Sequence, residues 1–238
     1  MPSVDSMKTS PAMRLLRQVS IDSLYVLVGF PLGLITLVLF MTGFFLGIGT
    51  LIIWIGLPVL TATLFLARGF AVVERARVAP VFGQRMPHPN YRRLGPDAGP
   101  VRRLLQPLAD PQSWLDLLHG MFRFIPSTIA FSFVVTWWAG ALGGLSAPLW
   151  DWAIPRGPDD QDLPELLGMG SSTGTRLVLY VAIGIFFLGT LYPVVRGVAM
   201  LEAWFARGLL SGVGELREQV AEANAAREVA QAQKAAAV

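Results

Sequence analysis

The sequence predicts an all-α membrane protein whose four transmembrane helices form two tandem hairpins, followed by a C-terminal cytoplasmic helix. Three observations support this fold class. The chain has 53% apolar and 15% charged residues, whereas a soluble domain carries about 25% charged residues. The apolar residues gather in four long blocks that are nearly free of charge, which is typical of transmembrane helices. Arginine is abundant in alternate loops only, as the positive-inside rule requires.

The four predicted spans cover residues 24–46, 52–73, 124–145 and 177–195. Each is long enough to cross roughly 30 Å of hydrocarbon at about 1.5 Å per residue. The first is longer than the apolar region of a signal peptide and lacks a small-residue cleavage site, so we expect a membrane anchor. The first two spans are joined by the short stretch 47–50, which predicts antiparallel neighbouring helices.

The distribution of basic residues predicts that both chain ends lie in the cytoplasm and that the protein crosses the plasma membrane. The segment between the third and fourth spans contains one basic residue, Arg156, and Arg176 flanks its end. The predicted divisions are a cytoplasmic N-terminus (1–23), a first hairpin (24–73), a basic cytoplasmic loop with an interfacial helix (74–123), a second hairpin (124–197) with an acidic extracellular segment (146–175), and a cytoplasmic signalling helix (198–238).

An interfacial helix is predicted within the basic loop. Asp110 followed by Pro111 has the pattern of an N-cap and a first helical residue. We expect this helix to lie on the inner membrane surface and to lead into the third span, with Arg123 extending its guanidinium toward the interface. Its predicted apolar face consists of Trp114, Leu117, Leu118, Met121 and Phe122.

The two halves of the chain share a short internal repeat. The pattern R-G-x-A-x-x-E occurs at 68–74 and again at 196–202, after the second and fourth spans. This predicts a parallel repeat of two hairpins, with Arg68 and Arg196 at the inner phosphate level and each glutamate one to two turns beyond. Both copies also have an aspartate before an early proline: Asp22 and Pro31, Asp116 and Pro126.

No motif in the sequence indicates catalysis. The chain has no cysteine, which excludes disulfides and thiolate metal sites, and it lacks a phosphate-binding loop, G-x-S-x-G and H-E-x-x-H. His88 and His119 are expected to be ordinary loop or surface residues. The hydroxyl groups of the spans fit bonds to their own helix better than a transport path. We therefore expect no catalytic residue, cofactor or metal, and no nucleic-acid partner, because the basic residues lack interleaved aromatics.

The acidic outer segment is the candidate signal-input site. Trp150 and Trp152 are expected to hold it against the bilayer, and Asp159, Asp160 and Asp162 follow. Clustered carboxylates can bind a hard cation, but the run lacks the alternating spacing and the glycine of a calcium loop. A solvated acidic loop is therefore the favoured interpretation.

The last predicted helix carries a heptad pattern that is the candidate signal-output and dimer seam. A homodimer would give this helix a partner and let it pass movement inward, whereas the alternative is a frayed surface helix. The seam residues are Leu209, Val213, Leu216, Val220 and Ala223.

Short motifs in residues 14–212 are together similar to a known family. They are Gly56-Leu57-Pro58-Val59, Arg68-Gly69, Glu74-Arg75, Tyr91-Arg92, Asp110-Pro111, Trp114, Asp116-Leu117-Leu118, Pro148-Leu149-Trp150, Trp152, Pro155 and Arg196-Gly197. In their order and spacing the chain resembles the actinobacterial "putative sensor" module, found at the N-terminus of two-component sensor histidine kinases.

The resemblance implies a membrane sensor that signals to a histidine kinase core. No histidine follows His119, so no phosphoacceptor or ATP-binding residue is transferred to this chain, and we do not expect it to be an enzyme. The kinase core is expected in cis beyond Val238 or in a separate cytoplasmic partner. Two alternatives stay open: a small transport or channel subunit, and a scaffold that docks a cytoplasmic partner or anionic lipid through the arginine-rich loop.

Overall fold

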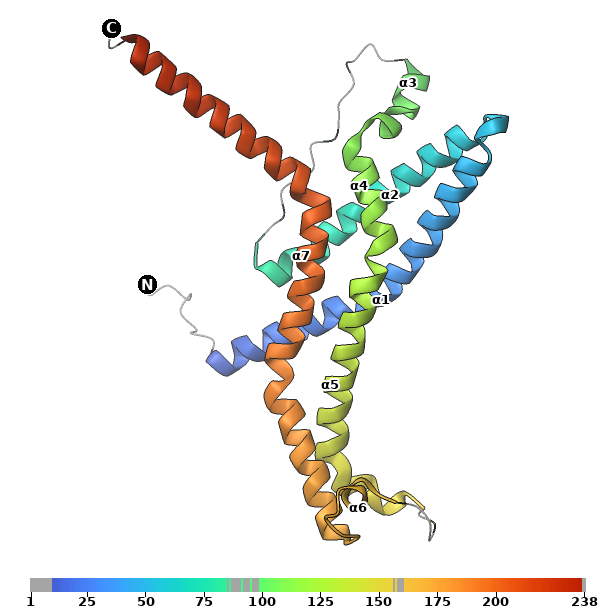
Figure 1. Cartoon of the computed structure of the whole chain (residues 1–238), viewed down its shortest axis with the longest axis vertical. Coiled ribbons are helices and arrows are strands. Elements are labelled where there is room, and N and C mark those ends of the chain that lie inside the picture. The colour runs from blue at the N-terminus through green and yellow to red at the C-terminus, as the bar shows by residue number, and fades with distance from the viewer. Residues whose placement is uncertain are drawn as a thin grey trace, which may run out of the picture. The chain divides into compact units, whose positions relative to one another are not determined.

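A computed structural model describes residues 10–84, 86, 91, 95, 99–155, 157 and 161–236, except for the side chains of 212–218, 232 and 234–236. The described residues form helices and connecting turns, with no strand among them (Figure 1). Four helical segments are long and apolar enough to cross a membrane: Pro11–Gly49, Gly56–Phe82, Pro111–Ala153 and Thr173–Ser211. The predicted all-α fold with four such helices is confirmed.

The first hairpin consists of α1 (Pro11–Gly49), the short 3-10 helix η1 (Leu51–Ile53) and α2 (Gly56–Phe82). The turn reverses the chain at Trp54, whose φ of 63° lies in the left-handed region. Gly56 is required beside it, because a Cβ there would lie 2.1 Å from the carbonyl oxygen of Gly47. This close approach joins α1 and α2 as the antiparallel neighbours that the sequence predicts.

The connection from the first to the second hairpin contains α3 (Pro100–Leu104), the 3-10 helix η2 (Gln106–Ala109) and α4 (Pro111–Phe122). The predicted N-cap is confirmed: the Asp110 carboxylate accepts a hydrogen bond of 3.2 Å from the backbone N–H of Gln112, and Pro111 occupies the first turn. This cap satisfies one of the backbone donors that a helix start leaves unpaired.

The second hairpin consists of α5 (Phe124–Trp150) and α7 (Thr173–Ala236), connected by η3 (Asp151–Ala153) and α6 (Leu163–Leu166). The two long helices approach closely at a pair of glycines, since a Cβ on Gly144 would lie 2.6 Å from the Cα of Gly184. Small residues at such a crossing let helix backbones pack closely in a membrane. Helix α7 has 64 residues and continues well past the predicted fourth span.

By its contacts the chain divides into two compact units that cut across the hairpins. Unit 1 contains residues 1–27 and 128–199, and unit 2 contains residues 28–127 and 200–238. In unit 1, indole N–H groups tie the helices together: Trp137 donates to Thr190 at 3.0 Å and Trp138 donates to Ser23 at 3.0 Å. These bonds satisfy the polar ends of otherwise apolar side chains.

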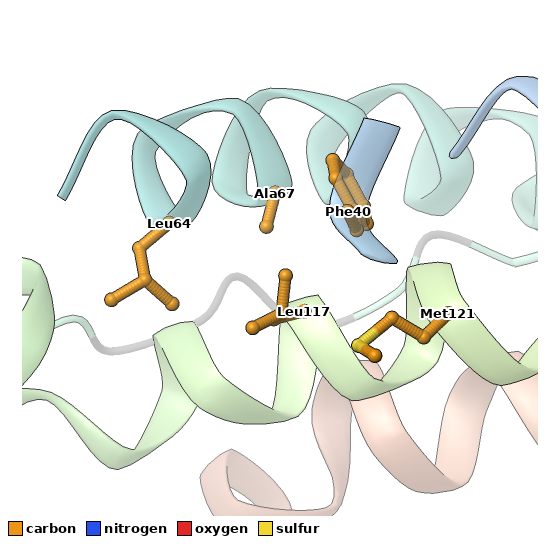
Figure 2. Packing of buried hydrophobic residues seen from close by; sticks show 5 residues of the cluster. All are labelled: Phe40, Leu64, Ala67, Leu117 and Met121. Carbon is orange, nitrogen blue, oxygen red and sulfur yellow. The ribbon is translucent and has the colours of Figure 1, made fainter. Parts of the chain in front are cut away.

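The apolar core of unit 2 lies between α1, α2 and α4 (Figure 2). Partly buried side chains of Phe44, Phe70, Leu108 and Trp114 surround this core. Between membrane helices such packing stabilises through van der Waals contact, because lipid tails are as apolar as the side chains. The central residues are Phe40, Leu64, Ala67, Leu117 and Met121.

Helix α4 is therefore not the free amphipathic surface helix that the sequence predicts. Leu117 packs in the core, but Leu118 and Phe122, predicted on the same face, are 40% and 51% exposed. The polar side of α4 is also covered, since Gln112 and Asp116 are buried. An ion pair between Asp116 and Arg75 compensates the burial of this polar side. Hydrophobic periodicity alone does not reveal such a partner.

Candidate functional site

The candidate site is a set of ion pairs buried within unit 2. Its centre, here called the Arg123 cluster, consists of Arg123, Glu74, Arg77, Glu202 and Ser127. Nη1 of Arg123 lies 2.6 Å from Oε2 of Glu74, and Nη2 lies 3.7 Å from Oε1 of Glu202. Arg77 binds the same Glu74 oxygen at 2.5 Å, and the Ser127 hydroxyl donates to Glu202. One guanidinium thus contacts carboxylates from two different helices.

Local helix geometry explains this arrangement. Glu74 and Arg77 are three residues apart on α2 and therefore share one face. Arg123 occupies the junction of α4 and α5, and Ser127 lies one turn further along α5. Nη2 of Arg123 also donates to the Gly29 carbonyl of α1 at 3.4 Å. The cluster consequently joins α1, α2, α5 and α7.

The expectation that Arg123 extends to the membrane interface is wrong. The residue is 4% exposed, and its charge is neutralised by Glu74 and Glu202 instead of by water or lipid phosphate. A buried arginine is tolerated when carboxylates and carbonyl oxygens satisfy its donors. Glu74 and Glu202 are the two glutamates of the internal repeat, so the repeated motif supplies the acidic partners of one arginine.

A second group, here called the Arg75 cluster, consists of Arg75, Asp116, Tyr91, Gln112 and the backbone carbonyl of Leu210. Nη2 of Arg75 donates to Oδ1 of Asp116 at 2.9 Å and to the Leu210 carbonyl at 2.9 Å. The Gln112 amide donates to the same two acceptors at 3.0 and 3.2 Å. Both bonds to Leu210 attach α7 to α2 and α4.

Tyr91 completes the Arg75 cluster from the segment between α2 and α3. Its hydroxyl donates to Oδ2 of Asp116 at 2.6 Å. Burial, followed by this hydrogen bond and the negative charge of Asp116, raises the pKa of Tyr91 to about 12. The phenol therefore stays protonated at neutral pH and acts as a hydrogen-bond donor.

The two arginines of the internal repeat each bind a carboxylate. In unit 2, Arg68 contacts Asp110 at 2.8 Å and donates to the Ser113 hydroxyl at 2.7 Å. In unit 1, Arg196 contacts Asp22 at 3.1 Å. Their depth in the membrane stays a prediction, but their partners are now identified.

Several buried polar atoms of unit 2 have no hydrogen-bond partner within the described part of the chain. They include both ring nitrogens of His119 and Oε2 of Glu202. His119 is 3% exposed and lies against the Phe205 ring, with centroids 5.8 Å apart, so the expected surface position for this histidine is wrong. His88 lies outside the described residues. Among the described residues, no three His, Asp or Glu side chains are grouped closely enough to hold a metal ion.

The described part of the predicted input segment is organised by Arg176 and is not a freely solvated acidic loop. Arg176 binds Asp151 at 2.7 Å and Asp162 at 2.8 Å, and Asp151 is buried. Asp159 and Asp160 lie outside the described residues. Trp152 is 81% exposed and Trp150 is 38% exposed, which leaves their predicted contact with lipid a prediction.

The predicted output seam is only partly described. Leu209 is half-buried, whereas Val220 and Ala223 are exposed in the single chain. The side chains of Val213 and Leu216 lie outside the described residues. The neighbouring Leu210 is completely buried and packs within unit 2.

Comparison with known families gives one match. The family model described as "Putative sensor" matches residues 25–210, which is most of the chain. The chain belongs to this sensor family. Comparisons with curated proteins and with solved structures found no match. The match covers both the Arg123 cluster and the Arg75 cluster, and membership of the sensor family supports a sensing role.

The sequence pattern identifies some members of these clusters, but it does not identify their pairings. The glutamates of the repeat and the paired Asp22 and Asp116 were visible as a pattern, but not as partners of arginines. The available signal was the occurrence of carboxylates close to arginines near the predicted span ends. Within the described part of unit 2, the ion pairs join four arginines and four carboxylates: Arg68, Arg75, Arg77, Arg123, Glu74, Asp110, Asp116 and Glu202.

Proposed function

We propose that this sensor-family chain is the membrane input module of a two-component system. It receives an envelope or membrane stimulus and transmits it through α7 to a histidine kinase core, located in cis beyond Val238 or in a separate cytoplasmic partner. The proposal places the protein in the plasma membrane with both termini in the cytoplasm, as the arginine distribution predicts. The module itself carries out no catalysis.

One observation carries the proposal: α7 is attached to the other helices by charged groups at two levels. Glu202 contacts Arg123 and Ser127, and two turns later the Leu210 carbonyl accepts from Arg75. A stimulus that changes the packing of α2 or α5 must therefore change the position of α7 or break these contacts. Packed interfaces respond by switching between discrete arrangements that differ by a few kcal/mol.

The output step in this proposal is a change in register between two copies of α7. Leu209, Val213, Leu216, Val220 and Ala223 form the seam of a homodimer, and Leu210 faces the interior of its own chain. Rotation of α7 at the Arg75 cluster would then alter the pairing of the seam. A dimerising helix that continues from a membrane span is a direct mechanical link to a kinase core.

Cysteine cross-linking in membranes tests the proposal, because the chain has no native cysteine. Single cysteines from 209 to 223 are oxidised, and cross-linking between chains is expected to peak at Leu209, Val213, Leu216 and Val220. Introducing Glu202→Gln or Arg75→Gln is expected to shift the positions of these peaks. The exposed Arg227→Gln is the matched control and should leave the pattern unchanged.

Two results would contradict the proposal. If no position cross-links above background, α7 is not a dimeric output helix. If purified protein transfers phosphate from ATP to itself, the module is catalytic. A pattern that peaks at the seam and moves only with Glu202→Gln and Arg75→Gln supports both the dimer and the role of the buried charges.

The alternative functions gain little support from the contacts. Hydroxyl groups expected along a transport path donate to their own helices, as Thr36 does to Gly33 and Thr61 to Leu57. A scaffold needs available arginines, but Arg75 of the basic loop binds Asp116 inside the protein. In the sensor proposal, these charged groups act by holding the helices of the protein together.

A further inference from the structure

Glu202 of α7 carries a buried carboxyl group whose negative charge is poorly compensated. The residue is 2% exposed. Its Oε1 accepts a hydrogen bond from the Ser127 hydroxyl and lies 3.7 Å from Nη2 of Arg123. Its Oε2 is buried and has no hydrogen-bond partner among the residues that the structure describes. A buried charge with so little compensation is costly, whereas the neutral, protonated carboxyl group costs much less to bury.

Glu74, the other glutamate of the Arg123 cluster, has stronger partners. Its Oε2 lies 2.6 Å from Nη1 of Arg123 and 2.5 Å from Nη1 of Arg77. Two short contacts with guanidinium groups compensate its negative charge. The two glutamates therefore share Arg123 unequally, and Glu202 is the partner with the weaker contact.

Gly29 of α1 allows the charged groups to come this close. A Cβ added there would lie 2.9 Å from Oε1 of Glu202 and 3.2 Å from Nη2 of Arg77. The Gly29 carbonyl also accepts from Nη2 of Arg123 at 3.4 Å. All of these residues belong to unit 2. The glycine backbone thus leaves the space in which the side chains of α2, α5 and α7 meet.

Helix α4 contributes a histidine near this position. The ring of His119 lies against Phe205, three residues after Glu202 on α7, with centroids 5.8 Å apart. Both ring nitrogens lack a hydrogen-bond partner within the described structure, so His119 does not compensate the Glu202 carboxyl group by a hydrogen bond. The titratable and charged side chains that surround Glu202 are Glu74, Arg77, Arg123 and His119.

We propose that Glu202 is a proton-binding site and that the bound proton releases α7 from Arg123. When Glu202 is ionised, its charge attracts the Arg123 guanidinium. When Glu202 is protonated, this attraction is lost and Arg123 remains with Glu74. The contact between Arg75 and the Leu210 carbonyl does not depend on Glu202, so α7 is loosened at one level and stays attached two turns later. The inference names acidification as a stimulus, and it rests on the proposed function only for the transmission along α7.

Infrared difference spectroscopy of the chain in lipid bilayers tests the assignment, because a protonated carboxyl group has a carbonyl stretching band that a carboxylate lacks. Spectra at about pH 8 and about pH 5.5 are compared, since exposed glutamates, with an ordinary pKa of about 4, stay largely ionised in this range. We expect a carbonyl band that appears on acidification and is missing in Glu202→Gln. Glu222→Gln, on the exposed part of the same helix, is the matched control and should keep the band.

Two further variants test the environment of Glu202 and have opposite expected effects. Ser127→Ala removes a hydrogen bond to the ionised carboxyl group, so the midpoint of the band should move to higher pH by about one unit or more. Glu74→Gln removes a neighbouring negative charge and leaves Arg123 and Arg77 for Glu202, so the midpoint should move to lower pH by about as much. Ser127→Ala is the smaller change and serves if Glu74→Gln does not fold.

Cysteine cross-linking of α7 at the same two pH values tests the release of the helix. At the lower pH the pattern of the unmodified chain should become that of Glu202→Gln, which mimics the protonated carboxyl group. The pattern of Glu202→Gln itself should not change with pH. Glu222→Gln should respond to pH as the unmodified chain does.

Several outcomes would overturn the inference. If no band appears, or if it persists in Glu202→Gln, Glu202 is not the proton-binding site. Shifts of the same sign in Ser127→Ala and Glu74→Gln would contradict the described environment. A pH-dependent band with an unchanged cross-linking pattern would refute the release of α7. Absence of cross-links at both pH values would instead contradict the proposed dimer, and the band alone would then decide the proton-binding site. Loss of the band confined to Glu202→Gln, with shifts of opposite sign, supports the assignment.

Discussion

The guanidinium of Arg75 donates a hydrogen bond of 2.9 Å to the backbone carbonyl of Leu210, 135 residues away in the sequence. The contact links α2 to α7 without using an α7 side chain. It is strengthened by the positive charge of the donor and by burial of both groups.

Removing this contact is expected to loosen α7 after Leu210. In Arg75→Gln, backbone amides from 211 to 220 should exchange with deuterium about tenfold faster or more, because a hydrogen bond to a charged group contributes about 1.5–3 kcal/mol. Hydrogen-exchange mass spectrometry in a bilayer measures the change. Arg227→Gln, on the exposed end of α7, serves as the control. Unchanged exchange in Arg75→Gln would show that α7 is held by other contacts.

Arg123 and Glu74 are expected to be energetically coupled. Arg123→Met leaves Glu74 and Glu202 buried near each other and should lower the free energy of unfolding by about 3–5 kcal/mol. Adding Glu74→Gln should cost less than the sum of the single changes, with a coupling of about 0.5–3 kcal/mol. Denaturant unfolding in mild detergent gives the four values. Strict additivity would contradict the ion pair.

Tyr91 should titrate near its raised pKa of about 12 instead of the usual 10.0. Because the folded pKa exceeds the unfolded one, the contribution of Tyr91 to stability is complete below about pH 10 and is lost as the pH rises toward 12. Absorbance at 295 nm of the native chain minus that of Tyr91→Phe isolates this phenol. Asp116→Asn should lower the Tyr91 pKa, while a native value near 10 would mean that the hydroxyl is not bound to Asp116.

The close crossing of α5 and α7 should be sensitive to a single methyl group. In Gly184→Ala the new Cβ would lie 2.5 Å from the backbone nitrogen of Leu145, so we expect a loss of about 1–3 kcal/mol from overpacking. Gly189→Ala, on the same helix, meets no atom within 4 Å and should change stability by less than about 1 kcal/mol. Thermal unfolding of both variants checks the difference, and equal effects would argue against the crossing.

The predicted orientation can be measured with introduced cysteines and a membrane-impermeant thiol reagent. Gly168→Cys, in the connection between α6 and α7, should be labelled in intact cells. Ala225→Cys, near the C-terminal end of α7, should be labelled only after the membrane is permeabilised. The reverse pattern would place both termini outside the cytoplasm and would remove the basis for a cytoplasmic kinase partner.

The sequence predicted the long helices because the bilayer imposes a simple constraint: each span must be apolar and must satisfy its own backbone. Asp110 was recognisable as a cap for a similarly local reason. These features depend on neighbouring residues, so spacing and composition are sufficient to identify them.

The pairing of charges depends on contacts between distant segments and could not be predicted in the same way. Arg123 lies next to the apolar block that begins at Phe124, and that position alone suggests the membrane interface. Its actual environment is determined by Glu74 and Glu202, 49 and 79 residues away in the sequence (123 − 74 and 202 − 123). Periodicity identifies the face of one helix, but it does not identify which helices cover that face.

The unbroken course of α7 has a consequence for any domain attached to its C-terminal end. Each residue of an α-helix turns the chain by about 100°, so seven residues return to nearly the same direction. Lengthening α7 by seven residues after Leu210 would therefore preserve the angular phase of an attached domain, whereas three or four would turn the seam away from its partner. Natural fusions of this module should tolerate linkers in steps of seven.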